Sequence, residues 1–227
     1  MRILVTRPVE DGEAIAEKLR ALGHEPLLAP LLAFQAIDGP EPDLTGVQAI
    51  LASSANGIRA LVRRSGRRDI AVFAVGPQTT EEARKAGFIT VKNADGDAHA
   101  LADATARWTI ADKGALLHVC GAKAPGTLGD DLRARGFDVR RAVLYRMMAA
   151  THLPPDVEAA LPTLDAVLFF SPRTAKIFAD LVRGRMPPHL TALCISPATA
   201  AALEAGNFAE IRVAARPNQE ELLALVA

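Results

Sequence analysis

Small and polar residues follow several apolar runs of the chain, where a strand would give way to a helix. Helix N-termini carry unpaired backbone N–H groups and a partial positive charge, so they bind carboxylates and phosphates. Several such ends facing one cleft would suit a ligand with many negative charges. The alternative is that the serines only cap their own helices. The positions are Thr6-Arg7, Ser53-Ser54, Gly76-Pro77, Ser171-Pro172 and Ser196-Pro197.

Two other side chains are candidates for chemistry. Arg7 directly follows a predicted strand, on the side where ligands of parallel sheets bind. Tyr145 is the only tyrosine and lies in the apolar run AVLYRM, so a role in the core and a role in function both remain open. The basic run Arg59 to Arg68 is interpreted as the solvated face of a helix.

The sequence lacks the motifs of nucleotide-binding, metal-dependent and acyl-transfer enzymes. It contains no GxxxxGK[ST], GxGxxG or HExxH motif and no GxSxG elbow. In the segment 121–127 (GAKAPGT), the lysine precedes the second glycine, unlike in a phosphate-binding loop. Cys120 and Cys194 lie in apolar runs without a CxxC pair, which is typical of buried thiols. We therefore expect no metal and no cofactor.

The overall charge argues against large charged partners. Lys plus Arg and Asp plus Glu number 26 each, so neither nucleic acid nor a membrane surface is an expected partner. No signal peptide and no apolar run long enough to span a membrane is evident, which predicts a cytoplasmic protein. The neutral surface suits a monomer.

Short apolar runs alternate with amphipathic helical patterns along the whole chain. This alternation predicts an α/β protein with parallel sheets covered by helices, and Asp97 and Asn218 are expected helix caps. The predicted strands are 2–5, 26–34, 47–52, 70–75, 88–91, 115–120, 138–146, 165–170, 191–195 and 211–215.

The two halves of the sequence repeat one pattern. Gly23 corresponds to Gly136, Ser54 to Ser171 and Pro77 to Pro197, each near a strand or helix end. The clearest pair is AVGPQTTEEARKAG beside CISPATAAALEAG, the second of which ends at Gly206. A generic α/β rhythm is the alternative, but three landmarks in the same order favour a duplication. The ligand site is expected in the cleft between the two copies.

An ordered set of segments resembles the uroporphyrinogen-III synthase family. The segments are VTRP, LASSANGIRAL, AVGPQTTEEARKAG, LRARGFDVRRAVLYRM, AVLFFSPRTAKIF and ISPATAAALEAG. The resemblance covers nearly the whole chain.

The resemblance implies a specific architecture. It predicts two similar flavodoxin-like domains, each a parallel sheet flanked by helices, joined by a two-stranded linker. The first domain would comprise 1–34 and 150–227, the second 39–144, and the linker strands 35–38 and 145–149. The first segment of the chain would therefore pair with the last.

The resemblance also implies an activity. The family cyclises hydroxymethylbilane, a linear tetrapyrrole, and inverts its ring D through a spiro intermediate, releasing water without cofactor or metal. Tyr145 matches the tyrosine proposed to assist loss of the substrate hydroxyl. The matching substrate contacts are Arg7, Ser54, Thr79, Ser171 and Thr199, with backbone amides near Gly76, Pro172 and Ser196.

Two departures from the family pattern concern carboxylate contacts. The segment GAKAPGTLGDDL lacks an expected arginine, for which Lys123 is a candidate substitute, and Ser196 stands where the family often has glycine. The alternative function is a non-enzymatic cytosolic module that binds or senses an anionic small molecule.

Overall fold

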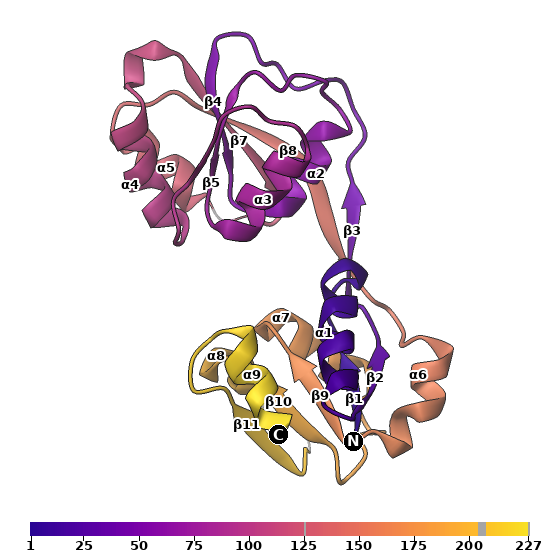
Figure 1. The fold of residues 1–227 in the computed structure, drawn as a ribbon. Coiled ribbons are helices and arrows are strands. Elements are labelled where there is room, and N and C mark those ends of the chain that lie inside the picture. Colours follow the sequence, from indigo (N-terminus) through magenta and orange to yellow (C-terminus); the bar gives the residue numbers. More distant parts are fainter. Residues whose placement is uncertain (125, 204–207, 227) are drawn as a thin grey trace. The chain divides into compact units, whose positions relative to one another are not determined.

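The structure is a computed structural model that describes residues 1–124, 126–203 and 208–226 (Figure 1). It divides into two compact units: unit 1 comprises Met1–Ala33 and Met148–Ala227, and unit 2 comprises Phe34–Met147. The division falls inside two strands, β3 (Leu32–Ala36) and β8 (Val139–Ala149). Gly206, the predicted end of a helix, lies outside the described residues.

Unit 1 is built on a five-stranded sheet in the order β11-β10-β9-β1-β2, and its neighbouring strands are parallel. Its strands are β1 (Arg2–Val5), β2 (Glu25–Leu28), β9 (Ala166–Phe169), β10 (Thr191–Cys194) and β11 (Glu210–Val213). Its helices are α1 (Val9–Ala21), α6 (Pro155–Ala160), α7 (Pro172–Leu181), α8 (Pro197–Ala201) and α9 (Gln219–Leu223), with short 3-10 turns η2 (Leu161–Thr163) and η3 (Ala224–Val226).

Unit 2 contains a six-stranded sheet in the order β3-β8-β7-β4-β5-β6, in which β8, β7, β4, β5 and β6 pair in parallel. Its other strands are β4 (Val47–Ala52), β5 (Ala71–Ala74), β6 (Val91–Asn93) and β7 (Ala115–Gly121). Its helices are α2 (Ala55–Val62), α3 (Pro77–Lys85), α4 (Ala98–Trp108) and α5 (Thr127–Ala134), with a 3-10 turn η1 (Ala111–Lys113).

Helices cover both faces of each sheet (Figure 1). Successive strand residues point to opposite faces, so each buried strand supplies two cores. In β1, Leu4 packs with Phe178 of α7, whereas Ile3 and Val5 pack with Leu19 of α1. In unit 2, one face carries α2 and α3 and the other carries α4 and α5. The parallel sheets flanked by helices confirm the predicted α/β fold class.

The strand orders explain the repeat in the sequence. Unit 1 has the order 2-1-3-4-5 in its own chain numbering, which is the flavodoxin order. In unit 2, strands β8-β7-β4-β5-β6 have the same order if β7 and β8 count as the first two. The second unit is thus a circular permutation of the first.

One predicted strand is two strands in the structure. The expected strand 26–34 is β2 followed by β3, separated by Ala29-Pro30-Leu31. Pro30 lacks an N–H donor and restricts the residue before it, which ends β2. As a result, β2 belongs to the sheet of unit 1, whereas β3 pairs with β8 in the sheet of unit 2.

Candidate functional site

The carboxyl ends of parallel strands meet at one edge of each sheet, where ligands of open α/β sheets bind. In unit 1, this edge carries Thr6-Arg7, Ser171 and Ser196. In unit 2, it carries Ser54 and Gly76. The predicted site residues therefore lie at two edges, one in each unit.

Four strand-to-helix junctions share one backbone conformation. The φ and ψ angles are −162° and 155° at Ser54, −161° and 179° at Gly76, −162° and 153° at Ser171, and −156° and 160° at Ser196. Each residue is the N-cap of the helix that follows. The same turn therefore occurs at all four junctions, and the junctions differ only in their side chains.

Both junctions of unit 1 use their serine as a cap. Ser171 Oγ accepts a hydrogen bond from the Thr174 backbone N–H at 3.2 Å, and Ser196 Oγ accepts one from Thr199 at 3.3 Å. Each serine hydroxyl also lies 3.0 Å from the threonine hydroxyl. Thr174 and Thr199 are buried whereas Ser171 and Ser196 are partly exposed, so each pair links the interior of the unit to its surface.

Ser54 in unit 2 is an exception. Its side chain makes no cap hydrogen bond, and its Oγ lies 2.8 Å from the Oη of Tyr145. The residue three positions on is Gly57, where unit 1 has Thr174. The structure therefore brings together two of the predicted site residues, although 91 positions separate them in the chain.

Tyr145 is fixed in place by its surroundings. It is 9% exposed, and its ring stacks on that of Phe34 with centroids 5.5 Å apart. A Cβ built at Gly121 would lie 2.9 Å from two ring carbons, so only glycine lets the ring lie against β7 at this point. Both proposed roles of the tyrosine are therefore compatible with the structure: the ring belongs to the core, and the hydroxyl has a polar partner.

Arg7 is held within unit 1. Its guanidinium forms an ion pair with Asp11, one helical turn on, and lies over the Phe170 ring at 4.9 Å from the centroid. The neighbouring Thr6 hydroxyl donates to the Leu168 carbonyl at 2.8 Å, which ties the ends of β1 and β9. These contacts position Arg7 beside the junction that contains Ser171.

The remaining predicted contacts lie at the same junctions. Pro172 is exposed at the start of α7, and a Cβ at Gly76 would meet no atom within 4 Å. Thr79 is 4% exposed and follows Gly76 in the first turn of α3. Lys123 is exposed after β7.

Sequence reasoning missed a buried histidine. His118 on β7 is 2% exposed, and its Nε2 lies 3.2 Å from the Oγ of Ser53. Burial, with smaller contributions from Arg141 and Arg133, lowers the pKa of His118 to about 4. The alternation within ALLHVC places His118 on the α4 and α5 face of the sheet, but nothing in the sequence indicates its serine partner.

The basic run beside α2 is engaged in local contacts rather than forming an anion site. Arg59 pairs with Glu82 at 2.8 Å, and Arg67 pairs with Asp69 at 2.7 Å. Arg63 lies over the Phe34 ring, and Arg68 donates to the Ala86 carbonyl. Arg64 donates to backbone carbonyls, one of them that of Pro40.

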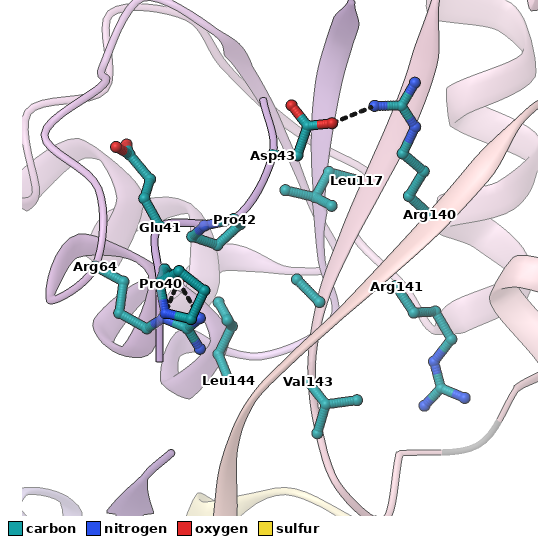
Figure 2. A pocket seen from close by; sticks show the side chains of 11 residues that line it. Pro40, Glu41, Pro42, Asp43, Arg64, Leu117, Arg140, Arg141, Val143 and Leu144 are labelled. Carbon is teal, nitrogen blue, oxygen red and sulfur yellow. Dashed lines mark hydrogen bonds and ion pairs between the residues drawn. The ribbon is translucent and has the colours of Figure 1, made fainter. Parts of the chain in front are cut away.

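A pocket of about 340 Å³ lies elsewhere in unit 2, beside β8 (Figure 2). Arg140 on its wall is 3.6 Å from the Asp43 carboxylate, and Arg64 is bonded to Pro40. None of the predicted site residues lines it.

Both cysteines are free and buried, and burial raises the pKa of the Cys194 thiol to about 12. Within 1–124, 126–203 and 208–226, no three His, Cys, Asp or Glu side chains are grouped as metal ligands. Over the same residues, no helix has the length and apolar character needed to cross a membrane.

Comparison with known proteins decides the family. The family model of uroporphyrinogen-III synthase HemD matches residues 13–224. The chain belongs to the uroporphyrinogen-III synthase family. Its members are cyclising lyases of haem biosynthesis, and their substrate is hydroxymethylbilane. Among curated proteins, no significant relative was found.

Solved structures of synthases share the fold. A uroporphyrinogen-III synthetase from Helicobacter pylori is 20% identical, with a TM-score of 0.70, and the match covers 100% of this chain and 98% of that one. A mutant uroporphyrinogen III synthase from Thermus thermophilus is also 20% identical, with a TM-score of 0.54 and coverage of 100% and 97%. These similarities establish the two-sheet α/β architecture.

Proposed function

We propose that this chain converts hydroxymethylbilane to uroporphyrinogen III with Tyr145 as the acid that assists loss of the substrate hydroxyl. The observation that carries this proposal is the ordered phenol at the carboxyl edge of unit 2. Tyr145 is the only tyrosine, its ring is fixed, and its hydroxyl has a polar partner in Ser54. General acid catalysis requires such a placed donor.

The first step is an elimination. The Tyr145 phenol gives its proton to the leaving hydroxyl, the carbon–oxygen bond breaks with its electron pair on oxygen, and water leaves. Loss of the pyrrole N–H proton then gives a neutral azafulvene. This N–H proton balances the one given by Tyr145 and restores the phenol. The ring closures that follow are isomerisations, in which the azafulvene nitrogen regains one proton and ring D loses one.

The second requirement is control of shape. Ring D has to attack through its substituted carbon to give the spiro intermediate, although its free carbon reacts more easily. Positioning of a flexible chain selects among such closures, because held groups react at high effective molarity.

We assign this positioning to the substrate's acetate and propionate groups. Their carboxylates suit helix N-termini and arginine. The proposed contacts are Arg7, Ser171 and Thr199 at the edge of unit 1 and Ser54 and Thr79 at the edge of unit 2. Backbone amides near Pro172, Ser196 and Gly76 complete the set. The burial of Thr79 and Thr199 supports a role in shaping their junctions beneath the substrate.

We also propose that the protein acts in the cytoplasm as a monomer and without nucleic-acid partners. The balanced charge supports the absence of nucleic-acid partners and suits a monomer.

The test is an isomer analysis with purified protein. Given hydroxymethylbilane, the protein should produce the type III isomer well above the spontaneous reaction, which gives the symmetric type I isomer. Tight binding of the substrate with only type I product would contradict the proposal and support a binding or sensor protein.

A further inference from the structure

We propose that Ser54 is a positioning residue, whose hydroxyl donates to the Oη of Tyr145 and thereby aims the phenol proton at the leaving group. This inference rests on the proposed function, because it gives the Ser54 hydroxyl a role through the acid. The proposed contact with a substrate carboxylate at this junction is then left to the backbone N–H groups at the start of α2.

The first support comes from comparing equivalent junctions. Ser171 and Ser196 have the same backbone angles as Ser54, and both cap their helices through the residue three positions on. Ser54 does not, although its conformation would permit it. Its hydroxyl is instead bonded to Tyr145 at 2.8 Å.

Gly57 provides a physical reason for this exception. A Cβ at this position would lie 2.8 Å from the carbonyl oxygen of Val119 on β7. Glycine therefore lets the first turn of α2 lie directly on the strand. At the equivalent junction in unit 1, Thr174 supplies a hydroxyl 3.0 Å from that of Ser171. Gly57 stands in the place of Thr174 and has no hydroxyl, so Ser54 lacks this local partner.

The surroundings of Tyr145 fix its ring but leave the direction of the phenol O–H bond open. Phe34 stacks on one side of Tyr145, and the glycine at 121 allows close contact with β7. A phenol hydrogen rotates to suit its partners. If Ser54 donates to Oη, the phenol hydrogen has to point elsewhere and can be given to the substrate.

The same hydrogen bond aids the elimination. As the proton leaves Tyr145, negative charge develops on Oη. A fixed donor next to developing charge stabilises it more than it stabilises the neutral phenol. Removing one such donor should lower kcat, about tenfold as a conservative expectation, with little change in KM.

Nuclear magnetic resonance can detect this hydrogen bond directly. Protein labelled with ¹³C at tyrosine Cζ gives one signal, because the chain has one tyrosine. Ser54→Ala should shift this signal, and Ser54→Thr, which keeps a hydroxyl, should restore it. Ser65→Ala is the matched control. Ser65 lies just after the C-terminal end of α2 and is 5% exposed, and its hydroxyl accepts a hydrogen bond from the Arg67 backbone N–H.

Kinetics tests the functional consequence. Ser54→Ala should lower kcat about tenfold in the natural background but have no further effect beside Tyr145→Phe, where the phenol proton is already lost. Ser54→Thr should recover most of the rate, and Ser65→Ala should leave it unchanged.

Each outcome has one meaning. An unshifted tyrosine signal in Ser54→Ala, or rate losses that multiply in the double variant, would overturn the positioning role while the synthase activity stands. A natural protein that forms no type III isomer would overturn the proposed function and the catalytic role with it. If the tyrosine signal of such an inactive protein still shifts in Ser54→Ala, only the hydrogen bond between Ser54 and Tyr145 is supported.

Discussion

At the scale of single residues, the candidate site is defined by hydroxyl partners rather than by charge. Ser171 and Ser196 are occupied as helix caps, whereas Ser54 is bonded to Tyr145. Arg7, the cation at the edge of unit 1, already has Asp11 as a partner. A polycarboxylate would therefore compete with Asp11 for Arg7 and meet exposed helix starts.

His118 supports a prediction about pH. Its folded pKa of about 4 lies below the ordinary value of 6.5, so the unfolded chain binds the proton more tightly. The contribution of neutral His118 is complete above pH 6.5 and is lost as the pH falls from 6.5 towards 4. From pH 7 to pH 5, this group should lower the free energy of unfolding by about 2 kcal/mol.

The measurement is urea unfolding followed by the fluorescence of Trp108, the single tryptophan, which lies in unit 2. The variant His118→Gln keeps an amide for Ser53 and should lose less stability over this pH range. Equal losses in the natural protein and the variant would refute the assignment to His118.

At the scale of elements, α2 lies so close to β7 that a Cβ at Gly57 would be 2.8 Å from the Val119 carbonyl oxygen. Gly57→Ala should destabilise unit 2 by about 1–3 kcal/mol, because the new Cβ meets the Val119 carbonyl. It should also lower kcat about as much as Ser54→Ala, since moving α2 breaks the hydrogen bond to Tyr145. Urea unfolding and steady-state kinetics measure both effects.

Gly66→Ala is the control for this change. A Cβ at Gly66 would meet no atom within 4 Å, so its unfolding free energy should change by less than about 1 kcal/mol. Equal effects of the two substitutions would show that the approach of α2 to β7 is not close.

Element types were predictable from the sequence wherever the pattern was local. The caps Asp97 and Asn218 accept from the backbone N–H three residues on, as their sequence pattern predicts. The break at Pro30 was missed, because two short apolar runs in succession have the same pattern as one long strand. The Ser54–Tyr145 bond could not be predicted, since it depends on the placement of two distant strands.

At the scale of the whole molecule, the duplication has different consequences for the two units. Unit 2 is one continuous segment, whereas unit 1 needs both ends of the chain, because β9 pairs with β1. The strand order of unit 1 therefore cannot form from the C-terminal part alone.

This difference can be tested with fragments. A fragment of residues 34–147 should unfold cooperatively, with Trp108 reporting the transition. A fragment of residues 148–227 should not, since β9 lacks its neighbour β1 and would leave an apolar edge exposed. Circular dichroism during urea unfolding distinguishes the two, and a cooperative transition in the second fragment would contradict the account.

We assign proton transfer to Tyr145 and isomer choice to the shape of the two sheet edges. A single-turnover reaction of Tyr145→Phe with hydroxymethylbilane, analysed for both rate and isomer, tests this division most directly. The rate should fall tenfold or more, a loss of at least about 1.4 kcal/mol of transition-state stabilisation, while the product formed above background remains type III. An unchanged rate, or a change of the enzymatic product to type I, would contradict it.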